Sequence, residues 1–413
     1  MNYNITTLSG GLRVIHRPTA SAVVYCGYQV AAGTRHELPG EEGLAHFCEH
    51  MTFKGTRRRS AVQIINALEQ VGGELNAFTN KEDTTFYAAV GRDHVSRAVD
   101  LLTDIVFHSE YPQPEVEKEA EVVCDEIESY NDSPAELIYD EFENLLFQGH
   151  PLGHNILGTA DRVRSYRSDD VSRFARRHYR PGNAVFFIDG DVSFQRVVRL
   201  LEANLSRESS LSRESSPARM PGLSRAACPA TPFSVTRRQG THQAHVMLGT
   251  QAYAYDDPRR MTLYLLNNIL GGPGMNARLN LALRERNGLV YTVESSMTCY
   301  GDTGLWAVYF GCDPHDVSHC LRLVRHQLDR LRQRPLSATQ LRTAQRQLKG
   351  QLAIACDNRE QFALDFGRSF LHRGTERHLG RLFASIDAVT AEELQGVALE
   401  LFDEQRLSTL IFR

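Results

Sequence analysis

The stretch TTFYAAVGRDHVSRAVDLLTDIV (84–106) places a strand, a turn and a helix in immediate succession. Apolar and aromatic residues lead up to Gly91 and Asp93, which mark a turn, and Val and Leu then recur at helical spacing. The same order returns in GLWAVYFGCDPHDVSHCLRLVRHQL (304–328). The repetition of this order within one chain predicts an α+β fold built from two copies of a related unit.

The segments on either side of these stretches repeat as well. Upstream, SAVVYCGYQVAAG (21–33) has a counterpart in QAHVMLGTQAY (243–253), and downstream, PEVEKEAEVVCDEIE (114–128) has one in ATQLRTAQRQLKGQL (338–352). Any α+β domain offers some strand–turn–helix segments, but four elements in the same order favour a duplication. We therefore expect two homologous domains, each a mostly antiparallel sheet flanked by helices.

A biased segment separates the two copies. Residues 205–232, LSRESSLSRESSPARMPGLSRAACPATP, are rich in Ser, Arg and Pro and contain a tandem LSRESS. Such a composition has little apolar surface to bury and is typical of a linker. The predicted organisation is a first domain at 1–204, a linker at 205–232 and a second domain at 233–413.

The bulk composition excludes several classes of function. The 413 residues carry a formal net charge of -4, so no nucleic-acid partner is expected. No apolar run reaches the roughly 18 residues of a membrane span, and the first residues do not resemble a signal peptide. The eight cysteines form no C-x-x-C pair, which is typical of reduced thiols. We therefore expect a cytoplasmic protein with no membrane partner.

The stretch GLAHFCEHMTFKG (43–55) carries the chemistry of the first copy. His46 and His50 are four residues apart, so on a helix both imidazoles point the same way and suit two ligands of one Zn²⁺. Glu49 can lie beside the metal without binding it and accept a proton from water. Three polar residues on a solvated helix are the alternative interpretation.

A catalytic zinc site needs one further protein ligand. The stretch EVEKEAEVVCDEIE (115–128) has a helical apolar stripe, and Glu119 and Glu126 lie two turns apart on a neighbouring face. A glutamate-rich helix is ordinarily a solvated surface. Packed against the histidine helix, however, it would complete a His/His/Glu site.

HFCEH resembles the H-x-x-E-H signature of inverzincins, and the wider pattern resembles the pitrilysin (M16) metallopeptidases, which include insulin-degrading enzymes and mitochondrial processing peptidases. In that family the third ligand is a glutamate some 75 residues after the motif, with another glutamate seven positions before it. Glu126 is 126 − 50 = 76 positions after His50. The resemblance implies that His46, His50 and Glu126 bind one Zn²⁺ per chain, that Glu49 is the base and that Glu119 supports a ligand histidine.

The resemblance extends along the whole chain. Its further motifs are GGELNAFTNKEDTTFY (72–87), HPLGHNILGT (150–159), YRPGNAVFFIDGDV (179–192), LGGPGMNARL (270–279) and LRERNGLVY (283–291). They imply that Tyr291 helps to hold the oxyanion of the scissile carbonyl and that Arg284 orders the site. They also imply that Asn76, Ala77 and Phe78 form an edge strand that contacts the backbone of an extended peptide substrate.

Taken together, the resemblance implies a zinc-dependent endopeptidase that captures peptides or unfolded segments in an enclosed chamber. Family chambers are clam shells of four such units, so this chain would supply half a shell. A homodimer is the simplest closure, and a heterodimer with a zinc-free relative is the competitor. A catalytically silent peptide-binding subunit and a cysteine-based redox protein are the alternatives from other classes.

The remaining candidate residues have simpler interpretations. Cys48 lies between the two histidines in sequence, but at about 100° per residue it points away from both, so we expect it to face the core. His94, His150 and His154 are expected to be polar loop residues rather than metal ligands.

Overall fold

The computed structural model describes residues 2–206 and 231–413. These residues divide into two compact units, and each unit takes segments from both halves of the chain. Among the described residues, the first unit contains 2–128, 154–206 and 355–378, and the second contains 129–153, 231–354 and 379–413. The predicted linker, 205–232, lies almost wholly outside the described residues.

The first unit is built on a six-stranded sheet with the order β1-β2-β6-β3-β5-β4. Its strands are β1 (Asn4–Thr7), β2 (Arg13–Pro18), β3 (Val23–Val30), β4 (Glu74–Thr79), β5 (Thr84–Gly91) and β6 (Ala184–Gly190). Only β2 and β6 run parallel, and every other neighbouring pair is antiparallel. The strand β4 lies at one edge and pairs with β5 alone among the described strands.

The second unit is built on a five-stranded sheet with the order β7-β11-β8-β10-β9. Its strands are β7 (Ser234–Arg237), β8 (Ala244–Ala252), β9 (Val290–Cys299), β10 (Gly304–Cys312) and β11 (Ser408–Phe412). Here too a single pair, β7 with β11, is parallel. When β2 is matched to β7 and β6 to β11, the two sheets share order and strand direction, and β1 is the addition. The predicted α+β fold with two related, mostly antiparallel sheets is confirmed.

Helices occupy most of the described chain between the strands. The chain up to residue 206 forms α1 (Leu44–Thr52), α2 (Ala61–Glu69), α3 (Val95–His108), α4 (Gln113–Asn131), α5 (Pro134–Leu146), α6 (Ala160–Ser165), α7 (Ser168–His178) and α8 (Phe194–Ser206). The chain from residue 231 forms α9 (Arg260–Gly271), α10 (Val317–Gln333), α11 (Ala338–Ala355), α12 (Arg359–Arg373), α13 (Leu379–Ala388) and α14 (Ala391–Leu401). The strand–turn–helix stretch at 84–106 therefore becomes β5 and α3, and its counterpart at 304–328 becomes β10 and α10.

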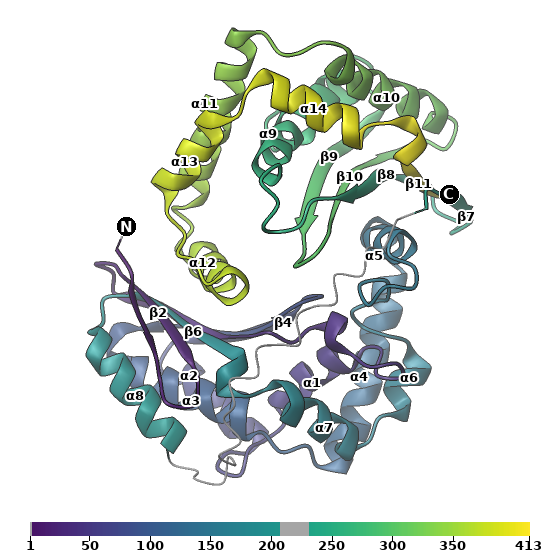
Figure 1. The fold of residues 1–413 in the computed structure, drawn as a ribbon. Coiled ribbons are helices and arrows are strands. Elements are labelled where there is room, and N and C mark those ends of the chain that lie inside the picture. Colours follow the sequence, from purple (N-terminus) through teal and green to yellow (C-terminus); the bar gives the residue numbers. More distant parts are fainter. Residues whose placement is uncertain (1, 207–230) are drawn as a thin grey trace. The chain divides into compact units, whose positions relative to one another are not determined.

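Both faces of the first sheet are covered. The central strand β6 reads AVFFIDG and is buried along its whole length, as expected for a strand with helices on both sides. On one face lie α3 and α8, and on the other lies α12, which comes from the C-terminal half of the chain (Figure 1). Phe362 and Phe366 of α12 pack with Phe187 of β6, and Gly367 lets the helix come close, because a Cβ there would lie 2.9 Å from the Phe187 ring.

The second sheet shows the reciprocal arrangement. The helices α9, α10 and α14 share one core with the sheet. On the other face, α5 of the N-terminal half contributes Ile138 and Phe142 to a core with Met247 and Phe412. Each sheet is therefore completed by one helix from the other half of the chain, which the division at 205–232 does not anticipate.

Two expectations about the whole chain can be compared with this architecture. Among the described helices, none combines the length and the apolarity that crossing a bilayer requires. No disulfide joins the described cysteines, which are Cys26, Cys48, Cys124, Cys299, Cys312, Cys320 and Cys356.

Candidate metal centre and active site

The helix α1 begins at a tightly packed turn. Gly43 precedes it with φ of +91°, and a Cβ there would lie 2.6 Å from the Leu157 carbonyl oxygen, so only glycine fits. Because glycine has no side chain to cap the helix, the buried carboxylate of Glu37 accepts hydrogen bonds from the backbone N–H of Gly43 (3.1 Å) and Ala45 (2.7 Å). His154 lies 2.8 Å from the same carboxylate. The Glu37 carboxylate, which lies outside the helix, therefore fixes the first turn of α1, where His46 lies.

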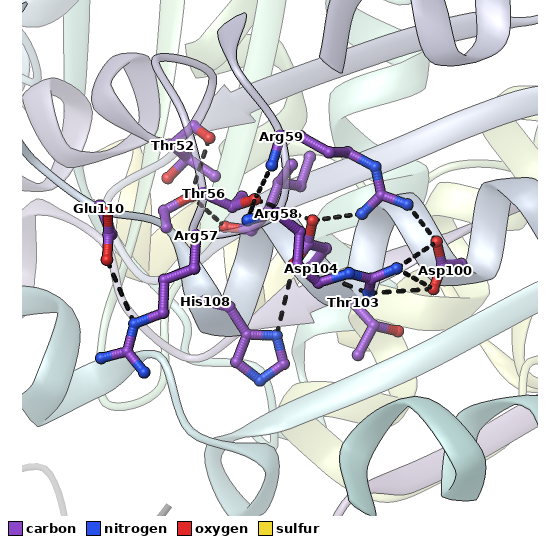
Figure 2. A network of polar contacts seen from close by, with 12 residues as sticks. Thr52, Thr56, Arg57, Arg58, Arg59, Asp100, Thr103, Asp104, His108 and Glu110 are labelled. Carbon is purple, nitrogen blue, oxygen red and sulfur yellow. Dashed lines mark hydrogen bonds and ion pairs between the residues drawn. The ribbon is translucent and has the colours of Figure 1, made fainter. Parts of the chain in front are cut away.

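The segment after α1 is anchored to α3 by a polar network (Figure 2). Arg59 forms ion pairs with Asp100 and with the fully buried Asp104, and Thr56 donates a hydrogen bond of 3.0 Å to Asp104. Burial alone would raise the pKa of Asp104, but the hydrogen bonds from His108, Arg59 and Thr56 hold it below its usual value. Both ends of α1 are therefore fixed by contacts within the first unit.

His46 and His50 lie side by side on α1, with ring centroids 4.5 Å apart. Glu126 reaches them from α4: its carboxylate oxygens lie 3.8 Å from His46 Nε2 and 3.4 Å from His50 Nε2. One donor atom from each of the three residues lies within 4.8 Å of the other two, so the group could hold a metal ion. Two imidazoles and a carboxylate are a donor set that zinc takes in catalytic sites, which leave one position open. The residues present therefore fit zinc.

Glu119 lies behind this cluster on the same helix, α4. Its carboxylate is 2.9 Å from His50 Nδ1 and also pairs with Lys54. Burial would raise the pKa of Glu119, but the hydrogen bonds with His50 and Lys54 outweigh it and lower the pKa. Burial would likewise lower the pKa of His50, and the bond to Glu119 with the nearby carboxylates raises it instead. Such a partner fixes the orientation of an imidazole.

His46 lacks this kind of support. Its Nδ1 atom is buried and makes no hydrogen bond to the described residues. Burial, together with the neighbouring His50, lowers the pKa of His46 to about 3. The ring is therefore neutral at physiological pH, which is the form that binds a metal.

Glu49 is buried beside the cluster and does not belong to it. Burial raises the pKa of Glu49 to about 7, against the hydrogen bond of 2.6 Å that Thr79 donates to its Oε2 atom. A buried carboxylate next to two imidazoles fits the predicted role of a general base, and that role remains a prediction for Glu49.

The predicted substrate strand lies where an incoming peptide could pair with it. Asn76, Ala77 and Phe78 belong to β4, at the edge of the first sheet. Asn76 and Phe78 are exposed and Ala77 is partly buried, which is the alternation of a strand with one covered face. Their contact with substrate remains a prediction.

Arg284 and Tyr291 belong to the second unit. Arg284 lies in a short π-helix (Asn280–Glu285) and Tyr291 lies near the start of β9, with the guanidinium 5.4 Å from the centre of the Tyr291 ring. Tyr291 is 80% exposed, so its ring lies outside the core of the second unit. The structure brings these two residues together, and their role at the zinc site remains a prediction.

The remaining candidate residues are Cys48 and the three histidines expected to lie in loops. Cys48 is fully buried in the core of the first unit, as expected, and burial raises its pKa to about 12. His94 and His150 are not among the three residues that form the candidate metal cluster. His154, expected to be a polar loop residue, has a defined partner in Glu37. Nothing in the sequence predicted a role for Lys54, Thr79 or Glu37.

Comparison with known proteins agrees with this geometry. The family description "Insulinase (Peptidase family M16)" matches residues 13–160, and "Peptidase M16 inactive domain" matches residues 165–348. An uncharacterized zinc protease of Streptomyces coelicolor is 34% identical over 398 residues, 96% of this chain and 86% of the relative. The beta subunit of the mitochondrial-processing peptidase of Bos taurus is 30% identical over 95% of this chain and 80% of its own.

A solved protease from Helicobacter pylori has the same fold, with a TM-score of 0.90 at 20% identity over 100% of this chain and 99% of its own. The duplicated fold and the cluster of two histidines with a carboxylate are the marks of a zinc-peptidase class. The chain belongs to peptidase family M16, and the predicted resemblance is confirmed. Membership of this family, whose relatives are named zinc proteases, supports a zinc-dependent peptidase activity.

Proposed function

We propose that this protein is a zinc-dependent endopeptidase that hydrolyses peptides or unfolded segments. In this proposal His46, His50 and Glu126 hold one zinc ion per chain, and Glu49 is the general base. The observation that carries it is the convergence of three donor atoms within 4.8 Å, next to a buried carboxylate that is not one of them.

Each residue has a separate task in the reaction. When bound, zinc supplies Lewis acidity, which lowers the pKa of a water molecule from about 15.7 towards ~7. Glu49 accepts a proton from the attacking water and delivers it to the nitrogen of the leaving amine. Glu119 orients His50 through the 2.9 Å contact with Nδ1. The negative charge of Glu119 is balanced by the ion pair with Lys54.

The second unit contributes to the transition state in this proposal. The hydroxyl of Tyr291 donates a hydrogen bond to the oxyanion that forms when water attacks the scissile carbonyl. Arg284 lies over the Tyr291 ring and orders it together with the substrate. The high exposure of Tyr291 and its contact with Arg284 support these roles.

The substrate binds as an extended strand. The edge strand β4 pairs with β5 on one side, and on its other side no described strand pairs with its backbone N–H and C=O groups. A peptide that adds as a strand on that side would contact Asn76, Ala77 and Phe78. This mode reads the peptide backbone rather than one side chain, which suits a chamber that selects by size and shape.

We also propose that the chain acts in the cytoplasm and closes its chamber by pairing. A homodimer is the simplest arrangement, and a heterodimer with a zinc-free relative is the competitor, because one relative is named as the beta subunit of a processing peptidase. Light scattering at low concentration tests this proposal. A stable monomer with full activity would contradict closure by dimerisation.

The central experiment uses a quenched peptide library with the wild type, Glu49→Gln and Glu121→Gln. Glu121 lies on α4, is exposed and pairs with Arg164, so it is a matched control for the loss of one carboxylate. We expect Glu49→Gln to bind zinc at the wild-type level and to lose cleavage, while Glu121→Gln stays active. We also expect a chelator to abolish wild-type cleavage and added zinc to restore it. Wild-type cleavage by purified Glu49→Gln would refute the base assignment.

A further inference from the structure

The edge strand and the general base are joined by one hydroxyl group. Thr79 is the last residue of β4, directly after Asn76, Ala77 and Phe78, and its Oγ1 atom lies 2.6 Å from Glu49 Oε2. Both side chains are buried, so water does not compete freely for this bond.

The direction of the bond follows from the groups on either side of the Thr79 hydroxyl. Thr84, opposite Thr79 in the β4–β5 register, donates its own proton to the Ala32 carbonyl oxygen at 2.8 Å, and its Oγ1 lies 3.3 Å from that of Thr79. An ionised carboxylate can only accept, so Thr79 donates to Glu49. The hydroxyl proton of Thr79 is therefore used in the hydrogen bond to Glu49, the proposed base.

The same chain of groups remains satisfied after Glu49 has taken a proton from water. A protonated Glu49 can donate to Thr79 Oγ1, Thr79 can then donate to Thr84 Oγ1, and Thr84 still donates to Ala32. A hydroxyl that is both donor and acceptor can hold the carboxyl group in one orientation before and after proton transfer. A methyl group in its place could do neither.

We propose that Thr79 is a positioning residue, which aims the Glu49 carboxylate and couples it to the strand that receives the substrate. A peptide that pairs with β4 at 76–78 would fix the position of the backbone at Thr79. Through its hydrogen bond, Thr79 would then fix the orientation of the Glu49 carboxylate. This inference rests on the proposed peptidase function. It predicts that the hydroxyl acts on the chemical step and not on substrate affinity.

The test compares Thr79→Val, which has nearly the same shape without a hydroxyl, with Thr79→Ser, which keeps the hydroxyl. We expect Thr79→Val to lower kcat about 10–100-fold with KM within about twofold, since misplacing a general base costs rates of this order. We expect Thr79→Ser to stay within about threefold of the wild type. Zinc content should be unchanged in both variants.

A matched control removes a different buried hydroxyl of the same unit. Thr103 lies on α3, donates to the Val99 carbonyl oxygen and contacts the Tyr28 hydroxyl, and neither of these bonds involves Glu49 or Thr79. Thr103→Val should lose some stability but keep its kcat.

A second measurement separates positioning from strand binding. In the inactive Glu49→Gln background, the affinity for a labelled peptide, measured by fluorescence anisotropy, should be the same with and without the additional Thr79→Val substitution. Equal losses of kcat and of peptide affinity would overturn the proposal, as would a fully active Thr79→Val or a folded, inactive Thr79→Ser. If the wild type cleaves peptides and Glu49→Gln does not, these outcomes refute the role of Thr79 alone. A wild type that cleaves nothing refutes the proposed function itself.

Discussion

Glu119 should set the strength of zinc binding without binding the metal. It is the side chain that supports His50, whereas Nδ1 of His46 makes no hydrogen bond to the described residues. The perturbation we consider is Glu119→Gln, which keeps the shape of the side chain and an acceptor for His50 but removes the charge. It also leaves Lys54 facing a neutral amide.

The magnitude follows from the hydrogen bond. A bond to a charged group is worth about 1.5–3 kcal/mol and a neutral one about 0.5–1.5 kcal/mol. The difference of roughly 1–1.5 kcal/mol corresponds to about a tenfold change in an equilibrium constant. This estimate lies at the lower end of the roughly 10–100-fold that changes behind metal ligands cost. We therefore expect the Kd for zinc to rise about tenfold.

The assay is competition between the protein and a chromophoric chelator at a fixed pH near 7.5. Glu121→Gln is the matched control, because Glu121 lies close to Glu119 in the same helix and pairs with the exposed Arg164. A Kd for Glu119→Gln within twofold of the wild type would refute the argument. An equal weakening in Glu121→Gln would show that the effect comes from the net charge of α4 and not from the contact with His50.

Further predictions concern pH and stability. Because the pKa of His50 is raised and that of His46 is lowered to about 3, only His50 should compete with zinc for a proton as the pH falls from 7.5 to 5.5. The Kd for zinc should then rise about tenfold for each pH unit at the acidic end, because one proton competes with the metal. A rise of about a hundredfold per pH unit would mean that two protons compete, and it would contradict a neutral His46. Asp104→Asn breaks a buried ion pair with the partly exposed Arg59 and should cost about 3 kcal/mol of unfolding free energy in urea, measured on zinc-free protein. Asp191→Asn, which removes an exposed pair with Arg92, should cost less than about 1 kcal/mol, and equal losses would contradict the role of burial.

Local patterns were sufficient for the parts of the site that depend on one element. The i, i+4 spacing places His46 and His50 on one face of α1, and the apolar stripe of residues 115–128 correctly turns Val116 and Val123 into the core. The repeated strand–turn–helix order predicted the two related sheets. The assignment of Glu126 needed the family resemblance, because spacing alone does not say which face of α4 meets α1.

The contacts that join separate elements were not predictable in this way. Thr79 reads as the end of a strand, and nothing in its neighbours shows that its hydroxyl reaches Glu49 on α1. Lys54 follows the motif in the quoted stretch, but its partner lies 65 positions further on, at Glu119. An amphipathic pattern shows that a helix buries one face and does not show against which sheet. For this reason the positions of α5 and α12 could not be inferred.

The reciprocal placement of α5 and α12 bears on how the protein could be divided. A cut anywhere between residues 206 and 231 would yield two fragments, each without the helix that covers one face of its sheet. The N-terminal fragment would leave Phe187 exposed, and the C-terminal fragment would leave Met247 exposed. Each fragment alone should therefore be prone to aggregation, whereas the two produced together should fold as an interlocked pair. Nicked protein should remain associated until a unit unfolds, because each unit contains chain from both sides of the cut.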